Sequence, residues 1–328
     1  MPDFADLSQR KKAILTASYL RAHNLTGVKS NDHYHDLQNN FIGIALQDED
    51  HPSLPLISVA IYCCVAQRVG LDAHPCGFPF HVHAIIKPTG WHDLDGSTVE
   101  SGSTAQPMYM DPFRTHKETP VYNLQSQLFA MGVPESDHSM LLGASPTAEI
   151  IRRTARNIMA SVQTIPRNPG SHLSGVLTLP DKDNAFYGAL WAQILLADGS
   201  RTTASVSRSR YLPYVLQHVE KNFPMDVGLV EEYIIPLIED PDQSVQLRDM
   251  MAAMRSADAM PKTVKKRTKE TAANVRYEVG QVFQHKRYHY YAMIIGWDAK
   301  CEAGEDWMSH MHVHQLSRGR NQSFYHAL

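Results

Sequence analysis

The chain has 328 residues and a formal net charge of −3, with 43% hydrophobic and 20% charged residues. This composition is ordinary for a globular protein, and the small net charge argues against nucleic-acid binding by the chain as a whole. The N-terminus does not resemble a signal peptide and the apolar runs are too short to span a bilayer, so we expect no membrane segment. Four cysteines without a CxxC pair are typical of reduced thiols, and we expect a cytoplasmic or nuclear protein.

The first 70 residues carry the pattern of helices. Apolar residues recur at helical spacing in residues 9–22 and again in residues 34–46. Residues 56–70 (LISVAIYCCVAQRVG) are apolar nearly all round, which predicts a buried helix that ends at Gly70. Because Cys63 and Cys64 lie inside this run, we expect both thiols to be buried and unreactive.

The pattern changes after Gly70 to short segments that favour strands. AHPCGFPF, HVHAII and QPMYMDPF are separated by polar loops and carry proline and glycine punctuation. Helices followed by a small antiparallel sheet predict an α+β fold. We assign residues 1–135 to this first domain.

The signal between residues 122 and 258 is helical again. Its apolar residues recur at i, i+3/i+4 and i+7 in IIRRTARNIMASVQ, NAFYGALWAQILLA, RYLPYVLQHVEKNF and VGLVEEYIIPLIED. Paired antiparallel helices loosely like tetratricopeptide hairpins are expected, although the strict repeat signature is absent. We assign residues 136–260 to a helical region packed on the first domain and residues 261–275 to a basic linker, for which a nuclear-import patch is the alternative.

Aromatic and β-branched residues alternate from Tyr277 onward, in YEVGQVFQHKRYHYYAMIIGWD. This alternation predicts a small β domain over residues 276–328. FYHAL at the end of the chain is expected to be a further strand. A sheet whose last strand has no following partner leads us to expect that this domain is incomplete.

Three residues have the order of a nucleophile, a base and an orienting carboxylate. Ser58 lies in the first turn of the predicted helix, where the helix N-terminus stabilises a developing anion. His81 and His83 are expected on a following strand, with only one of them pointing toward the helix, and Asp111 at the end of another strand. Ser58, His81 and Asp111 are therefore the candidate catalytic residues. The alternative is that Ser58 caps the helix and His81 hydrogen-bonds in the core.

HMHVH at residues 310–314 is a candidate metal site. If this stretch is a strand, His310, His312 and His314 share one face, and three imidazoles on one face could bind zinc. No cysteine or acidic residue accompanies them at a recognised ligand spacing. We therefore expect a structural role rather than a metal site, and we expect no cofactor.

The C-terminal region also contains candidate binding residues. From Arg276 to Leu328 there are six Lys and Arg and five Asp and Glu, so this segment has few cations for phosphate contacts. The linker adds Lys262, Lys265, Lys266, Arg267 and Lys269. We expect weak nucleic-acid binding by these cations. A protein partner is expected to contact Tyr288, Tyr290 or Trp297, because tyrosine and tryptophan are enriched in interface hot spots. Strand alternation places Tyr288 and Tyr290 on one face and Tyr291 on the other, so at most one set is expected to be free.

Several of these segments together resemble known families. YHDLQNNFIGIAL, PLISVAIYCCVAQRVGL, GFPFHVHAII and YMDPF resemble the bacterial transglutaminase-like/tetratricopeptide family and the middle region of a class of F-box proteins. YEVGQVFQHKRYHYYAMIIGWD, with HVHQL and QSFYHAL, resembles the YccV/HspQ-like (hemimethylated-DNA-binding) domain that occurs in the same class. The two resemblances cover about residues 30–115 and 276–328.

The resemblance implies a relic active site. The transglutaminase triad is Cys-His-Asp, and Ser58 stands at the position of the cysteine, followed by His81 and Asp111. Serine is a much weaker nucleophile than a thiolate, so we interpret the triad as that of a pseudoenzyme, kept for structure or ligand contact.

The function that the resemblance implies is non-catalytic protein interaction, as in the substrate-recognition region of an F-box ubiquitin-ligase subunit. The expected partners are ubiquitin-ligase components or substrates. Two alternatives are a transglutaminase-like hydrolase that uses Ser58 and a hemimethylated-DNA-binding protein. We recognise no F-box-like segment before residue 30, so the chain is expected either to lack an F-box or to be a fragment.

Overall fold

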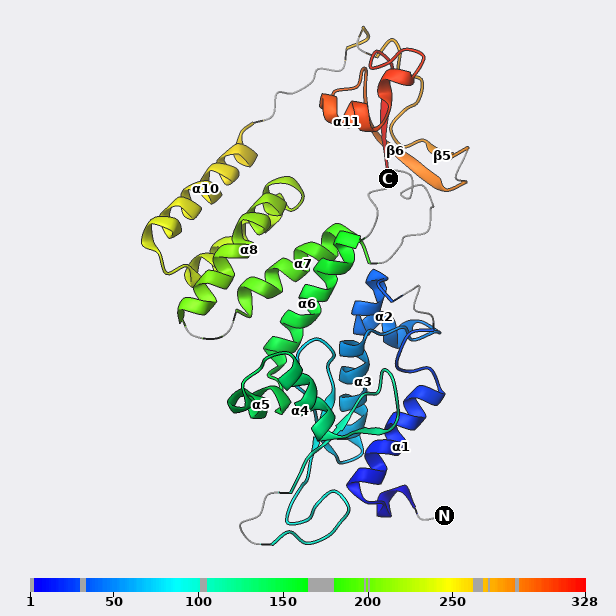
Figure 1. The fold of residues 1–328 in the computed structure, drawn as a ribbon. Helices are drawn as coiled ribbons and strands as arrows, with labels where there is room; N and C mark the ends of the chain where they lie inside the picture. The colour runs from blue at the N-terminus through cyan, green and yellow to red at the C-terminus, as the bar shows by residue number, and fades with distance from the viewer. Residues whose placement is uncertain are drawn as a thin grey trace. The chain divides into compact units, whose positions relative to one another are not determined.

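The computed structural model describes residues 3–29, 34–100, 105–164, 180–197, 199, 201–261, 268–270, 272–286 and 289–328, apart from the side chains of Arg201 and Asp306. Within this part of the chain, the residues up to Asp258 form one compact unit and those from Ala259 onward form a second (Figure 1). No helix in the described ranges is long and apolar enough to cross a membrane.

The first unit begins with helices that position the candidate site. They are the 3-10 turn η1 (Phe4–Asp6), α1 (Gln9–Ala22), the 3-10 turn η3 (Leu37–Asn40), α2 (Ile42–Gln47) and α3 (Pro55–Arg68). The helices predicted over residues 9–22 and 56–70 are confirmed. Residues 34–46 form η3 and α2 rather than one helix, because the extended backbone of Phe41 separates them. Pro55 is the first residue of α3, where its fixed φ angle suits a helix start and no N–H is needed.

A four-stranded antiparallel sheet follows α3, as the sequence predicts. Its strands pair in chain order: β1 (Asp72–Pro75), β2 (Ala84–Lys87), β3 (Met108–Met110) and β4 (Glu118–Thr119). Because side chains alternate along a strand, Ile86 and Met110 pack with α1 and α3 on one face, whereas Ile85 and Tyr109 face the other way. The sheet therefore has a buried core on each side.

The second face of the sheet is covered by α4 (Val121–Ala130) and α5 (Glu135–Leu142), through Leu124, Leu128 and Leu142. Two longer helices, α6 (Thr147–Thr164) and α7 (Lys182–Leu195), lie side by side beyond it (Figure 1). The unit continues through α8 (Arg201–Lys221), η5 (Pro224–Asp226), α9 (Val227–Leu229), the π-helical η6 (Val230–Ile234), η7 (Ile235–Leu237) and α10 (Pro241–Ala259). The helix expected over VGLVEEYIIPLIED is thus a series of short turns of different types. Pro236, which has no N–H to donate, lies in the last of them.

The second unit contains a three-stranded antiparallel sheet in the order β5 (Val282–Gln284), β6 (Tyr291–Asp298) and β7 (Phe324–Ala327). The strand expected at the end of the chain is confirmed by β7. Helix α11 (Glu305–His310) and the 3-10 turn η8 (Val313–Gln315) lie between β6 and β7 in the sequence. A small core is formed by Cys301, Met308 and Val313, with Phe324 packed against it.

The strand expected at HMHVH is wrong. His310 is the last residue of α11, His312 has a left-handed backbone with φ of 53°, and His314 lies in η8. HMHVH therefore runs from the end of α11 through a left-handed residue into η8, and Val313 is its buried residue. The three imidazoles therefore do not share a strand face.

The expectation that both adjacent cysteines are buried is right for Cys63 and wrong for Cys64. Cys63 faces the core between α3 and the sheet, and burial, with a smaller contribution from the neighbouring Cys64, raises the pKa of its thiol far above the usual value. Consecutive helical residues point about 100° apart, and Cys64 is exposed on the far side of α3. Because apolar residues occur all round this helix, its sequence does not indicate which side is exposed.

Candidate functional site

A histidine and an aspartate meet at one end of the first sheet. His81 lies in the loop before β2, and Asp111 directly follows β3. Because Ala84 of β2 pairs with Met110 of β3, the residues just outside this pair converge, and His81 Nε2 lies 2.8 Å from Asp111 Oδ2. The Asp111 side chain is almost completely buried, with 6% of its surface exposed, and that of His81 is 17% exposed.

The strand predicted for the two histidines starts later than expected, so that part of the prediction is wrong. Both His81 and His83 precede β2, after a turn in which Phe80 has a left-handed backbone with φ of 59°. His83 is buried, and its Nδ1 lies 3.0 Å from the His81 carbonyl oxygen. His81 is therefore the histidine that hydrogen-bonds to Asp111, while His83 contacts the backbone of His81.

Burial and charge act in opposite directions on Asp111. Burial alone would raise the pKa of its carboxyl group. The hydrogen bond and charge of His81, with smaller contributions from His83 and the Arg114 backbone N–H, outweigh burial and leave that pKa below its usual value. For His83, burial is the largest effect and lowers the pKa of the imidazole. The site thus favours a charged carboxylate beside a neutral buried imidazole.

Ser58 lies in the first turn of α3, as predicted, and is completely buried. Its Oγ lies 2.7 Å from Ser53 Oγ and 3.1 Å from the Ser53 carbonyl oxygen, and it accepts a hydrogen bond of 3.1 Å from the Gly27 N–H. A hydroxyl group has a single proton to donate. Among the described residues, every hydrogen bond of the Ser58 hydroxyl goes to Ser53 or Gly27.

Gly27 connects Ser58 to the segment that follows Asp111. A Cβ atom added to Gly27 would lie 3.7 Å from the Phe113 carbonyl oxygen, so the two backbones are close neighbours. The Phe113 ring in turn contacts the His81 ring edge-on, with 6.1 Å between the ring centroids. The structure therefore brings His81 and Asp111 into direct contact, whereas the Gly27 loop lies next to both Ser58 and this pair. That the three residues form a relic triad stays a prediction.

Four of the predicted binding residues lie outside the described residues: Lys265, Lys266, Arg267 and Tyr288. Tyr290 precedes β6, is 50% exposed, and stacks on His285. Trp297, near the end of β6, is half-buried.

The expectation that Tyr290 and Tyr291 cannot both be free is wrong. Tyr291 is the first residue of β6 and is 74% exposed, and Tyr290 outside the strand is exposed as well. Strand alternation does not apply to a residue that precedes the strand. Within β6 itself, alternation holds: Ala292 and Ile294 are buried, while Met293 is exposed.

No group of three or more His, Cys, Asp or Glu side chains that could hold a metal ion occurs within the described ranges.

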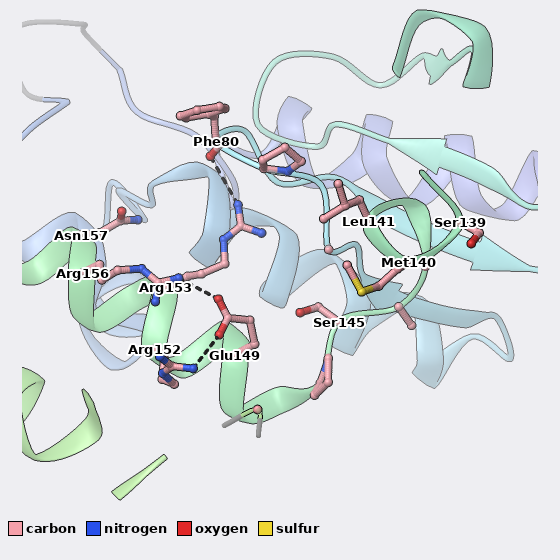
Figure 2. A pocket seen from close by; sticks show the side chains of 16 residues that line it. Phe80, Ser139, Met140, Leu141, Ser145, Glu149, Arg152, Arg153, Arg156 and Asn157 are labelled. Carbon is pink, nitrogen blue, oxygen red and sulfur yellow. Dashed lines mark hydrogen bonds and ion pairs between the residues drawn. The ribbon is translucent and has the colours of Figure 1, made fainter. Parts of the chain in front are cut away.

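Sequence reasoning missed a basic pocket on the first unit. This pocket of about 930 Å³ lies between the loop at residues 77–80, the segment at residues 139–146 and the start of α6 (Figure 2). Arg152, Arg153 and Arg156 of α6 line it. Arg152 and Arg156, at i and i+4, are neighbours on the helix surface, and Arg153 points within about 100° of both. The letters RRTAR within IIRRTARNIMASVQ therefore contain a signal that could have found the pocket.

Comparison with known proteins assigns classes to both ends of the chain. Residues 6–156 match the family described as "Transglutaminase-like superfamily", and residues 275–328 match that described as "Hemimethylated DNA-binding protein YccV like". The chain thus has a transglutaminase-like domain toward its N-terminus and a YccV-like domain toward its C-terminus. Both resemblances that the sequence motifs carry are confirmed.

The chain is similar to "F-box only protein 21" from three mammals. Identity is 24% over 286 residues for the proteins from Mus musculus and Homo sapiens, which covers 84% of this chain and 41% of each relative. The Pongo abelii protein is 24% identical over 279 residues, covering 84% of this chain and 40% of the relative. The chain therefore spans about two fifths of the length of these relatives. No solved structure matches it.

Proposed function

We propose that this chain is a non-catalytic protein-binding protein that serves as a substrate-recognition region of an F-box ubiquitin-ligase subunit. Its similarity to F-box only protein 21 and its combination of transglutaminase-like and YccV-like domains support this assignment. The observation that carries the non-catalytic part is the buried Ser58 hydroxyl, whose hydrogen bonds join it to Ser53 and Gly27.

A serine nucleophile needs a base that accepts its proton and a path by which substrate reaches its oxygen. Ser58 is completely buried, and its single proton is directed at Ser53. The pair of His81 and Asp111 is then best explained as a bond that fixes the loop before β2 to the end of β3. On this view the domain retains the shape of its enzyme relatives and uses its surface for binding.

The catalytic alternative is tested with a fluorophosphonate probe, which reacts with activated serines. We expect no labelling of Ser58 in the full chain under conditions that label a serine hydrolase completely. Stoichiometric labelling of Ser58 that is lost in His81→Ala would contradict the proposal and establish a hydrolase that uses Ser58, His81 and Asp111. Labelling that persists in His81→Ala would indicate nonspecific phosphonylation rather than a catalytic triad.

Protein binding is tested by proximity labelling from the full chain in cells, followed by titration of each purified candidate against the purified chain. We expect at least one saturable isotherm of 1:1 stoichiometry at physiological salt, with a ubiquitin-ligase component or a protein that it modifies. If every candidate fails to bind as a purified protein, the protein-binding function is rejected.

DNA binding is a second candidate function, and the YccV-like match at residues 275–328 favours it. The charge balance of this segment argues against tight binding, because it contains six Lys and Arg but also five Asp and Glu between Arg276 and Leu328. One of these cations is already paired within the unit, Arg320 with Glu305 at 3.2 Å. We therefore place DNA binding second to protein binding.

A further inference from the structure

The basic pocket on the first unit does not include any of the candidate triad residues. Its walls come from the loop that contains Phe80, from the end of α5 with Met140 and the residues after it, and from the first turns of α6 (Figure 2). At about 930 Å³ it is large enough for several side chains of a ligand. The pocket therefore needs an explanation of its own.

Charge in the pocket is unbalanced. Three arginines line it, and Glu149 is the acidic residue among its described lining residues. Both oxygens of Glu149 are engaged, Oε2 with Arg152 at 3.3 Å and Oε1 with Arg156 at 2.7 Å. Arg153 is thus the arginine for which the pocket supplies no carboxylate.

Among the described residues, one hydrogen bond is found for Arg153, which leaves most of its donors available to a ligand. A guanidinium group has five N–H donors, and the bond described for Arg153 is a long one of 3.4 Å from Nη2 to the Phe80 carbonyl oxygen. Figure 2 shows the Arg153 side chain extended across the pocket from α6 toward Phe80. Burial of the group lowers the pKa of its guanidinium, partly offset by the charge of Glu149. A half-buried cation without a paired anion gains more from an incoming anion than a fully hydrated surface arginine does.

The rim of the pocket near Arg153 is apolar and exposed. Phe80 is 86% exposed and Met140 is 70% exposed, although both are large apolar side chains. The left-handed backbone of Phe80, with φ of 59°, is an uncommon conformation for an aromatic residue and turns the ring outward. Exposed aromatic and methionine side chains beside an arginine are the composition of a binding surface.

We propose that this pocket binds a peptide segment of a protein partner in which an oxyanion lies next to an apolar side chain. Arg153 pairs with the oxyanion through its planar donors, and Phe80 and Met140 contact the apolar group. The oxyanion is a carboxylate or a phosphoryl group, since both accept the two parallel hydrogen bonds that a guanidinium offers. The inference rests on the proposed function in taking the occupant to be part of a protein.

The test uses small probes on the full chain. N-acetylphenylalanine and phenyl phosphate each join an aromatic ring to an oxyanion, and N-acetylphenylalanine amide is the uncharged match of the first. Binding is followed by NMR from the methyl signal of Met140, assigned with Met140→Leu. We expect saturable shifts with at least one anionic probe and none with the amide. The anionic probe that binds more tightly shows whether the oxyanion that the pocket prefers is a carboxylate or a phosphoryl group.

Two variants and one control connect the binding to the pocket. Arg153→Gln should weaken the anionic probe about tenfold, the usual effect of losing a charge-assisted hydrogen bond. Phe80→Ala removes an exposed ring while keeping the carbonyl group that Arg153 contacts, so it should weaken binding without loss of folding. Arg248→Gln, an exposed arginine of α10, is the matched control and should have no effect.

The inference is overturned if neither anionic probe shifts Met140, if the amide binds as well as the acid, or if Arg153→Gln and Arg248→Gln bind equally. None of these outcomes alters the labelling of Ser58 or the binding of purified partners. Failure of the pocket is therefore distinguishable from failure of the proposed function.

Discussion

His81 and Asp111 are joined by a hydrogen bond of 2.8 Å although 30 positions separate them in the sequence. The bond joins the entry of β2 to the exit of β3, so two side chains with the identities of a catalytic pair close one end of the sheet. Ser58, the residue predicted as the nucleophile, hydrogen-bonds instead to Ser53 and Gly27. The contrast between the His81–Asp111 contact and the buried Ser58 hydroxyl supports our proposal that this domain binds a protein without catalysis.

The first prediction concerns the Ser58 hydroxyl. Ser58→Ala should lower the free energy of unfolding by about 1–2 kcal/mol, because it removes buried hydrogen bonds while Ser53 Oγ remains to accept from the Gly27 N–H. Chemical denaturation monitored by circular dichroism measures this. Ser209→Ala, at an exposed position of α8, is the control and should change stability little. Equal stabilities for the two variants would show that the Ser58 network does not hold the domain together.

The second prediction is a loss of stability on mild acidification. Burial lowers the pKa of His83 in the folded chain below its unfolded value of about 6.5. As the pH falls, His83 therefore binds a proton in the unfolded chain before it does so in the folded chain. Its contribution to the free energy of unfolding is complete above about pH 6.5 and is lost as the pH falls below that value. Asp111 also has a lowered pKa, but its contribution is lost only below about pH 4, where the unfolded carboxyl is protonated.

Melting temperatures at pH 7 and pH 5 separate these two effects. His83→Gln should show a smaller decrease between the two pH values than the unmodified chain, even if it is less stable at both. The exposed His116→Gln should show the same decrease as the unmodified chain. A decrease that is identical in all three proteins would assign the acid sensitivity to other groups.

The third prediction concerns thiol reactivity. Cys64 is exposed, whereas Cys63, Cys76 and Cys301 are buried. Burial raises the pKa of Cys76 to about 11, partly offset by backbone hydrogen bonds, and that of Cys63 further. A maleimide should therefore modify one cysteine in the native chain and four after denaturation, as counted by mass spectrometry. Cys64→Ser should abolish the native modification, and Cys63→Ser should leave it unchanged.

The fourth prediction concerns DNA. We expect weak binding that falls steeply with salt, by a slope of about −0.9 per phosphate contact, and that is lost when Lys265, Lys266 and Arg267 are changed to glutamine. Contacts to phosphate do not read the bases, so hemimethylated and unmethylated duplexes should bind equally well. Fluorescence anisotropy of the full chain with both duplexes at two salt concentrations measures this. Tight, salt-tolerant and methylation-selective binding would make DNA the principal ligand of the YccV-like domain.

Helical periodicity predicted the framework of the first unit because its helices bury one continuous face. Helical spacing predicts residues 9–22 and an apolar run that ends at Gly70 predicts residues 56–70, and α1 and α3 match them closely. Spacing could not identify the exposed side of α3, because Cys64 and its buried neighbour Cys63 have the same hydrophobicity. Which side of an apolar helix faces water depends on the elements packed against it.

Strand alternation does not predict side-chain directions where a turn interrupts the strand. Phe80 adopts a left-handed backbone, so the histidines after it lie in a loop whose geometry no two-residue period describes. His312 has the same kind of conformation within HMHVH. The contact between His81 and Asp111 can nonetheless be predicted from the sequence. It depends on the order of the strands and not on the strand face toward which each histidine points.

The basic pocket could not be predicted from the sequence, for a different reason. The sequence shows three arginines on one side of α6, but such a group is usually solvated and paired. Its significance depends on Glu149 being shared by Arg152 and Arg156, and on Phe80 reaching Arg153 from 73 positions away. Long-range juxtapositions of this kind are set by tertiary packing.

The Gly27 N–H lies within 3.1 Å of both the Ser53 and the Ser58 hydroxyl oxygens, and the Gly27 carbonyl accepts a bond of 2.9 Å from the Ser53 N–H. An amide that is hydrogen-bonded in this way is protected from exchange although it belongs to no helix or strand, so we expect its hydrogen to be replaced by deuterium when the contacts with Ser53 and Ser58 open. Exchange at this one position would then report the opening of the domain that carries His81 and Asp111, in a loop where fast exchange is the usual expectation.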